Sequence, residues 1–211
     1  GALRCTSDTY LLVESSSFFS CTTSSSQGGA IYFSNTNSGQ CVLHEVCGYD
    51  CWSTYSSGSK YDQFAYLTVN HAVSSKNYVN YSSIARCVNS YSNSYYTMRH
   101  SNGRICYPSV NLSMNKCQYR STVALYPFTG LFTYCSFVDN VANGDSCIYS
   151  GRGNINIEFK SCNILRNTQG SRNSAGTIHT YDNMMFENSC ILENNANTIF
   201  YQASSYTITV S

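Results

Sequence analysis

Short apolar runs separated by polar clusters make up almost the whole chain. The runs are rich in Tyr, Phe, Ile and Val, and clusters of Asn, Ser and Gly divide them. Helical periodicity is nearly absent, and proline occurs only at Pro108 and Pro127. Runs of β-branched and aromatic residues bounded by turn-forming residues are typical of strands. The pattern therefore predicts an all-β protein.

Three nine-residue blocks, at 132–140, 159–167 and 186–194, share the pattern F-x-x-[CS]-x-[FI]-[VL]-x-N and recur at one constant offset. A period of this size with one β-rich unit and no helix indicates a β-solenoid, in which each coil buries its apolar residues against its neighbours. An antiparallel sandwich is the main alternative, but it does not predict a constant offset. The chain length suggests one domain over residues 1–211 with roughly eight coils, and an irregular insertion at about 52–77.

Residues in equivalent positions of successive coils should lie about 4.8 Å apart. We expect two apolar columns to form core ladders: Phe132, Phe159 and Phe186, and Phe137, Ile164 and Ile191. Asn140, Asn167 and Asn194 should form a ladder at a turn, because Asn tolerates the left-handed conformation and can bond to turn backbone groups. Further upstream the turn column is read as Cys21, Cys87 and Cys117, with Cys47 as a further candidate.

Twelve cysteines is a high number for a chain of 211 residues. Their irregular spacing argues against zinc, and we expect no metal and no cofactor. Disulfides in an oxidising compartment fit better. Cys87 and Cys117 should be stacked neighbours within disulfide range, with a reduced thiol stack as the alternative, and Cys135 and Cys162 should pair similarly. A third group near Trp52 is expected to staple a local loop: Cys41, Cys47 and Cys51.

Charged residues make up only 11% of the chain, and the formal net charge is +1. This composition gives no electrostatic reason to expect binding to nucleic acid or to an anionic membrane. No apolar run approaches the roughly 20 residues of a membrane-spanning helix. Asn80 and Asn111 begin glycosylation sequons, which are compatible with secretion. The first residue is Gly1 and the C-terminal residues have a strand-like pattern, so we expect a fragment of a longer chain.

Acidic residues are too scattered to suggest paired carboxylates for catalysis. The closest stacked pair, Asp139 and Glu193, is expected two coils apart with Arg166 between them, and a cation there stabilises both as anions. The four histidines share no spacing and are expected to be solvated or hydrogen-bonded surface residues: His44, His71, His100 and His179. The sequence therefore predicts a protein that is not an enzyme.

Two motifs carry a family resemblance. The segment 28–32, Gly-Gly-Ala-Ile-Tyr, resembles the GGA[ILV] motif of the polymorphic-outer-membrane-protein repeat, and 137–140, Phe-Val-Asp-Asn, resembles its FxxN motif. Residues 175–178 are similar to a degenerate second GGAI. The chain also resembles Cys-, Tyr- and Ser-rich surface proteins of trichomonad-like protists. This resemblance implies a right-handed parallel β-helix of the pectin-lyase type, displayed outside the cell, with a role in adhesion.

The leading functional hypothesis is a secreted or cell-surface structural or adhesion protein, whose partner is a host or cell-surface protein or a glycan. Its expected contact surface includes aromatic residues of the irregular stretch: Trp52, Tyr55, Tyr61 and Tyr66. Aromatic side chains on loops stack on sugars or pack on proteins, although these could instead fill a wider coil. The alternatives are a carbohydrate-binding or carbohydrate-cleaving module, and an extracellular filament that self-associates end to end through exposed strand edges.

Overall fold

The computed structural model describes residues 1–24, 27–54, 61–88, 94–153, 155–170, 175–203 and 205–211. All regular secondary structure in these residues is β-strand, arranged in five parallel sheets. Within the described residues there is no helix with the length and apolar character needed to cross a membrane.

Three long sheets form the walls of the molecule, which we name sheets A, B and C. Sheet A contains β1 (Leu3–Cys5), β5 (Ile31–Ser34), β9 (Tyr61–Thr68), β12 (Ser94–Ser101), β16 (Arg120–Tyr126), β20 (Ile148–Ser150), β24 (Ile178–Thr180) and β27 (Phe200–Gln202). Sheet B contains β2 (Tyr10–Glu14), β6 (Gln40–His44), β10 (Lys76–Asn80), β13 (Arg104–Pro108), β17 (Thr129–Thr133), β21 (Asn156–Lys160), β25 (Asn183–Glu187) and β28 (Ile208–Val210). Sheet C contains β3 (Ser17–Phe19), β7 (Cys47–Tyr49), β11 (Ser83–Ala85), β14 (Asn111–Ser113), β18 (Ser136–Val138), β22 (Asn163–Leu165) and β26 (Cys190–Leu192).

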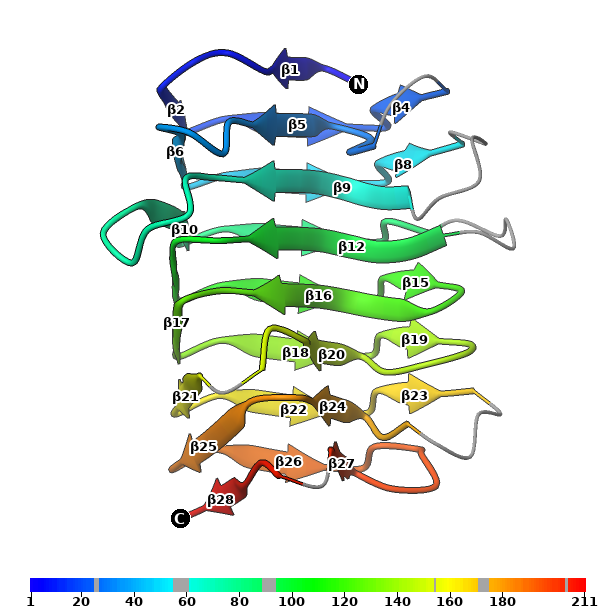
Figure 1. Ribbon diagram of the computed structural model, residues 1–211. Coiled ribbons are helices and arrows are strands. Elements are labelled where there is room, and N and C mark those ends of the chain that lie inside the picture. Colours follow the sequence, from blue (N-terminus) through cyan, green and yellow to red (C-terminus); the bar gives the residue numbers. More distant parts are fainter. Residues whose placement is uncertain (25–26, 55–60, 89–93, 154, 171–174, 204) are drawn as a thin grey trace.

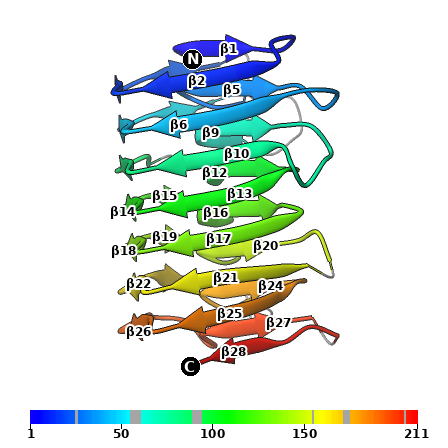
Figure 2. The same ribbon diagram turned by 90° about the vertical axis from the view of Figure 1, so that its left-hand side faces the viewer.

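Two short sheets close the fourth side of the coils. One contains β4 (Thr22–Thr23) and β8 (Trp52–Ser53), and the other contains β15 (Lys116–Cys117), β19 (Val141–Ala142) and β23 (Thr168–Gln169). In Figure 1 the chain passes along sheet A in front, turns into sheet B on the left and returns behind, moving downward with each turn. Figure 2 shows sheet B face on. This winding is right-handed, so the predicted parallel β-helix is confirmed, with sheets of eight, eight and seven strands.

Part of the irregular stretch expected at about 52–77 belongs to the regular coil. Strand β9 pairs with β5 and β12 in sheet A, which places Tyr66 between Tyr32 and Arg99. The connection 69–75 to β10 protrudes at the left of Figure 1. Residues 55–60 lie outside the described part of the chain.

The lumen of the helix is the hydrophobic core, and its predicted ladders are confirmed. Phe159 stacks on Phe132 with ring centroids 4.5 Å apart and on Phe186 at 4.7 Å. Phe137, Ile164 and Ile191 occupy one register column of sheet C. Side chains that alternate along each strand point into this lumen, which is why the repeat buries the same positions in every coil.

Sharp corners flank sheet C in every coil. Among the described residues, all non-glycine residues with positive φ except Asn102 lie at these corners. The corner before sheet C is formed by Ser15, Glu45, Tyr81, Ser109, Tyr134, Ser161 and Asn188, and the corner after it by Ser20, Asp50, Arg86, Met114, Asp139, Arg166 and Glu193. A single left-handed residue redirects the strand, and the next side chain then points into the lumen.

The predicted asparagine ladder follows the second corner and is confirmed. The amide of Asn140 donates to Oδ1 of Asn167 at 3.0 Å, and that of Asn167 donates to Oδ1 of Asn194 at 3.0 Å. Asn115 extends the ladder upstream, because its amide donates to Oδ1 of Asn140 at 3.1 Å. Each Oδ1 also accepts a backbone N–H from the coil before, so the ladder satisfies buried corner groups.

The register corrects two members of the predicted turn column. Asn115, not Cys117, lies above Asn140, since Cys117 pairs with Ala142. Cys51, not Cys47, belongs to the column, because Cys47 pairs with Ser17 and Ser83 on the outer side of sheet C. The column therefore reads Cys21, Cys51, Cys87, Asn115, Asn140, Asn167 and Asn194.

This register also revises the predicted cysteine pairs. Cys87 lies above Asn115, whose Oδ1 accepts its backbone N–H at 2.9 Å, so the prediction that Cys87 and Cys117 are stacked neighbours is wrong. Cys135 and Cys162 are in register, as predicted. All twelve cysteines carry free thiols in the structure.

The predicted staple of three cysteines near Trp52 is wrong as well, because the three side chains point in different directions. Cys41 is buried on the lumen side of sheet B, Cys47 is exposed on sheet C, and Cys51 is buried after the second corner. Sequence proximity failed here because strand alternation and the corner separate these residues.

Candidate functional site: an arginine and tyrosine face on sheet A

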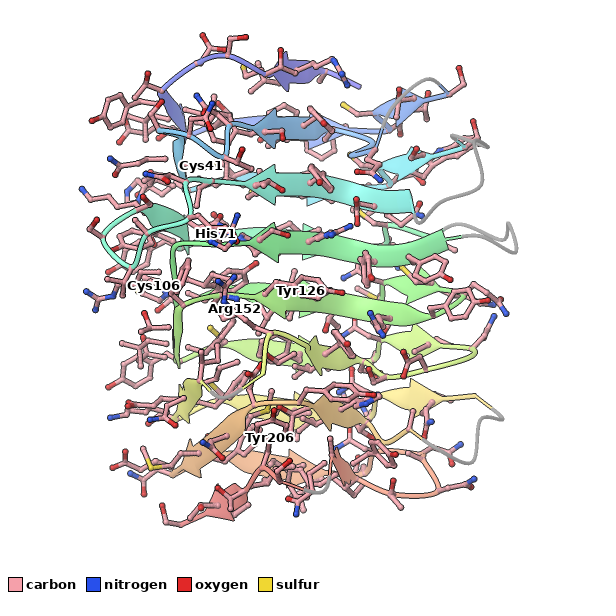
Figure 3. All side chains as sticks on the ribbon, viewed as in Figure 1. Cys41, His71, Cys106, Tyr126, Arg152 and Tyr206 are labelled. Carbon is pink, nitrogen blue, oxygen red and sulfur yellow. The ribbon has the colours of Figure 1, made fainter. Side chains whose placement is uncertain are left out.

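The outer side of sheet A carries a column of arginine, tyrosine and histidine residues that is interrupted by Ala124 and is largely buried at Tyr149 and His179. The column consists of Arg4, Tyr32, Tyr66, Arg99, Ala124, Tyr149, His179 and Tyr201, each paired in register with the next. Three further residues contact it from the side: Tyr96, Arg120 and Tyr126. We call these residues the arginine–tyrosine face, and Tyr126 marks its middle in Figure 3.

Local sequence explains why these side chains face outward. Most residues of the column directly follow a buried residue of the lumen, such as Ile31 before Tyr32 and Ile148 before Tyr149. Successive side chains of a strand point to opposite sides, so the residue after the buried column is always external. The GGAI-like motif thus contained a usable signal for this face that the sequence analysis missed.

Cation–π and stacking contacts connect the upper part of the face. The Arg4 guanidinium lies 4.3 Å from the ring centroid of Tyr32, and the rings of Tyr32 and Tyr66 stack at 5.0 Å with 7° between their planes. Arg99 lies 5.2 Å from both Tyr66 and Tyr126. The ring faces are therefore directed at one another and at guanidinium groups, along the helix axis.

Arg120 organises the middle of the face. Its Nε donates to Asp145 at 2.7 Å and its Nη1 donates to the Tyr96 hydroxyl at 2.9 Å, while the guanidinium lies 3.2 Å from the Tyr149 ring centroid. Burial disfavours the charged guanidinium, but Tyr96 and Asp145 outweigh it and raise the pKa of Arg120. A register shift between Tyr96 and Met98 places Tyr96 opposite Arg120.

His179 lies in the lower part of the face against the same carboxylate. Its Nδ1 is 3.1 Å from Oδ1 of Asp145, and its ring is surrounded by Tyr149, Tyr181 and Tyr201 at centroid distances of 5.2, 5.1 and 4.7 Å. Burial would raise the pKa of Asp145, but His179 and Arg120 together lower it. Nε2 of His179 is buried and has no hydrogen-bond partner among the described residues.

Two of the predicted surface histidines are buried. His179 is 7% exposed, and His100 lies in the lumen with no exposed surface. His100 contacts Asn77 through Nδ1 at 2.8 Å and the Tyr107 hydroxyl through Nε2 at 2.5 Å. The prediction failed because burial of an imidazole leaves no local sequence pattern.

The two predicted aromatic contact residues whose side chains the structure describes, Trp52 and Tyr66, lie in different sheets. Tyr66 belongs to the arginine–tyrosine face, whereas Trp52 lies in the short strand β8, opposite Thr22. Tyr61 begins β9. Tyr55 lies outside the described residues. The outer surface of sheet A, not the irregular stretch as a unit, is therefore the candidate site.

The predicted glycosylation residues lie on other surfaces. Asn80 ends β10 in sheet B, and Asn111 begins β14 in sheet C. The Asn111 amide donates to Ser83 and Ser113 hydroxyls, both at 3.0 Å. These contacts hold the amide against the sheet, so modification of Asn111 would require them to break.

The expected cation between the stacked acidic residues is present. Arg166 donates to both carboxylate oxygens of Asp139, at 2.8 and 3.0 Å, and this contact lowers the pKa of Asp139. In the part of the chain that the structure describes, no three His, Cys, Asp or Glu side chains gather in a way that would hold a metal ion.

Comparison of the chain with protein-family models, with curated proteins and with solved structures finds no match. The function must therefore be argued from the fold and from the arginine–tyrosine face.

Proposed function

We propose that the chain is a secreted or cell-surface β-helix that serves adhesion or structure and has no catalytic activity. The observation that carries the proposal is the arginine–tyrosine face, which follows the helix axis along sheet A. Tyrosine and arginine are enriched in binding hot spots because they combine a large apolar area with hydrogen-bond donors. A rigid stack of coils holds these side chains in place before a partner arrives, which lowers the entropic cost of binding.

The geometry of the face favours a protein partner with polar and acidic surface groups. Tyr32 and Tyr66 use their ring faces to stack on each other, and the guanidinium of Arg4 covers Tyr32. Ring edges, hydroxyls and guanidinium N–H groups remain for a partner. A sugar that stacks on an aromatic ring needs a free ring face, so a cell-surface protein fits this face better than a glycan.

A noncatalytic role is supported by the ion pairs that hold two carboxylates, one at the arginine–tyrosine face and one at the second corner. Asp145 is held by Arg120 and His179, and Asp139 is held by Arg166. Paired catalytic carboxylates need one member with a raised pKa, whereas these contacts lower the pKa of both groups.

A carbohydrate-binding or carbohydrate-cleaving module is the second candidate, and one observation favours it. The Asp145 carboxylate orients the His179 imidazole and leaves its Nε2 without a partner among the described residues. An imidazole held in this way has the geometry of a general base. Hydrolysis of a polysaccharide by the wild-type chain, abolished in His179→Gln, would favour this function over adhesion.

Two matched double variants test the proposed binding face. Arg4→Gln/Tyr32→Ser alters the arginine–tyrosine face, and Arg104→Gln/Tyr78→Ser makes the same chemical changes on the outer side of sheet B. Each chain is applied to an array of immobilised cell-surface glycoproteins, before and after enzymatic deglycosylation. We expect the first variant to lose about tenfold or more in affinity and the second to bind like the wild type.

The other outcomes distinguish the alternatives. Equal binding by both variants, or equal loss in both, would overturn the role of the face. Binding that disappears on deglycosylation would favour a glycan as the ligand. Concentration-dependent growth in light scattering without any array signal would favour a self-assembling filament.

A further inference from the structure

Three cysteines form a continuous stack at the second corner. Cys21, Cys51 and Cys87 occupy this position in three successive coils, because Thr22 pairs with Trp52 and the N–H of Asp50 donates to the carbonyl of Ala85. Neighbouring positions in adjacent coils lie about 4.8 Å apart. This separation falls within the Cα range of disulfides, which is about 4.4–6.8 Å.

Cys51 lies in the middle of the stack, with Cys21 in the coil on one side and Cys87 in the coil on the other. Its thiol interacts with both of these neighbouring thiols. The contact with Cys87 outweighs burial and lowers the pKa of Cys51 to about 7, whereas burial raises the pKa of both Cys21 and Cys87. Near neutral pH the central sulfur is therefore the member of the stack that loses its proton most readily, and the thiolate is the form that attacks disulfides.

Exposure differs along the stack. Cys21 is partly exposed, whereas Cys51 and Cys87 are buried. A small molecule in solution thus meets Cys21 first, and the thiolate of Cys51 lies directly behind it. Cys135 and Cys162 lack this arrangement of a partly exposed thiol in front of a buried one, because both of their thiols are buried.

We propose that the stack of Cys21, Cys51 and Cys87 is a thiol–disulfide exchange site for small-molecule disulfides such as oxidised glutathione. Cys21 loses its proton to solvent and attacks one sulfur of the disulfide, whose S–S bond breaks and releases one thiolate. Cys51 then attacks the Cys21 sulfur, the mixed disulfide breaks, and the second small thiolate leaves. Two protein thiols are oxidised to a Cys21–Cys51 disulfide, and the small disulfide is reduced to two thiols.

Cys47 provides an internal control for this chemistry. It is exposed and lies close in sequence, but its neighbours in adjacent coils are Ser17 and Ser83. Oxidised glutathione should form a mixed disulfide on Cys47 that has no second thiol to resolve it.

The test treats the reduced, folded chain with oxidised glutathione at pH 7.5 and maps the products by mass spectrometry of a non-reducing digest. We expect a Cys21–Cys51 disulfide and a glutathione adduct on Cys47. Cys51→Ser should stop the reaction at a glutathione adduct on Cys21. Cys21→Ser should leave Cys51 and Cys87 reduced, because the stack then has no partly exposed thiol that could begin the exchange.

Free Cys21 and Cys51 thiols in a wild-type chain that is modified at Cys47 would overturn the proposal. A lasting glutathione adduct on wild-type Cys21 would do so equally, since it would show that Cys51 does not attack. The wild type and Cys21→Ser decide the question even if Cys51→Ser fails to fold, as judged by its circular-dichroism spectrum.

Discussion

The residue after the second corner can be either a cysteine or an asparagine because both side chains reach the same backbone groups. The amide of Asn140 donates to the carbonyl of Leu112 at 2.8 Å, and the thiol of Cys51 donates to the carbonyl of Phe18 at 3.4 Å. Phe18 and Leu112 belong to one column of sheet C. Buried carbonyls need a donor, and a thiol is a weaker but smaller one. Part of the cysteine content is thus explained by corner hydrogen bonding.

Asn140 should contribute more to stability than any exposed asparagine. Replacing it with alanine removes the side-chain donor to the Leu112 carbonyl and the acceptor of the Asn115 backbone N–H, and it takes one of two contacts from the Asn167 Oδ1. We expect Asn140→Ala to lower the free energy of unfolding by about 3 kcal/mol and Asn140→Cys to lower it by less, as measured in urea. The exposed Asn143→Ala is the control. Equal stability of the two Asn140 variants would show that the thiol does not replace the amide.

Buried His100 should make the fold sensitive to acid. Burial lowers its pKa from 6.5 to about 3, and the neutral ring is held by Asn77 and Tyr107. As the pH falls below 6.5, the unfolded chain binds a proton that the folded chain does not, so stability falls by about 1.4 kcal/mol per pH unit until the pH approaches 3. Urea unfolding between pH 7 and 5 measures this slope.

His100→Leu should reduce that slope, because leucine binds no proton in either state. Leucine also fits the position, since Leu67 and Leu125 occupy it in the adjacent strands. The exposed His71→Gln should retain the wild-type slope. If the pH dependence of His100→Leu equals that of the wild type, the buried imidazole is not its source.

At the scale of the strand, the phenylalanine stack is the clearest source of cohesion between coils. Phe159 is fully buried between Phe132 and Phe186. We expect Phe159→Ala to cost about 3–5 kcal/mol of unfolding free energy and Phe159→Leu distinctly less. Phe19→Ala provides the comparison, because Phe19 is 63% exposed. A loss in Phe159→Ala no larger than that in Phe19→Ala would contradict a dominant role for the stack.

The strands that the sequence predicted best are those of the regular repeat. The three sequence blocks between 132 and 194 have the same length. Aligning them with one another therefore predicted both the phenylalanine ladder and the asparagine ladder. Coil lengths vary upstream of residue 132, so the alignment there is ambiguous. Matching Met114 to Phe137 placed Cys117 in the turn column. The structure instead pairs Leu112 with Phe137, and Leu112-x-x-Asn115 fits the FxxN-like pattern equally well.

The sequence analysis did not place Cys51 in the turn column, because its coil lacks the apolar residue that precedes the column by three positions in the repeat. Gly48 takes the place that Phe137 has further down. The Phe64 ring fills the space, and a Cβ on Gly48 would lie 2.3 Å from it. The arginine–tyrosine face could be predicted only in part, because the contacts of Arg120 depend on the register shift at Tyr96 and on the loop that carries Asp145.

For the whole molecule, stacking predicts unequal protection along the axis. Each central strand of sheet B has neighbours on both sides, whereas β2 and β28 have one neighbour each. Local opening of an end coil breaks contacts to a single coil, so it costs less free energy. We expect amides in β17 and β21 to exchange with deuterium far more slowly than those in β2 and β28. Uniform exchange rates would instead indicate that all coils open as one unit.

The asparagine ladder also bears on how such a chain grows. The step from Asn140 to Asn167 spans 27 residues, as does the step from Asn167 to Asn194. A tandem duplication of residues 141–167 would add one more ring to the phenylalanine stack and one more amide to the asparagine ladder. Unequal recombination within the gene could then lengthen the rod by about 4.8 Å per copy while it keeps both ladders continuous. Length is therefore a property that selection can adjust in single steps.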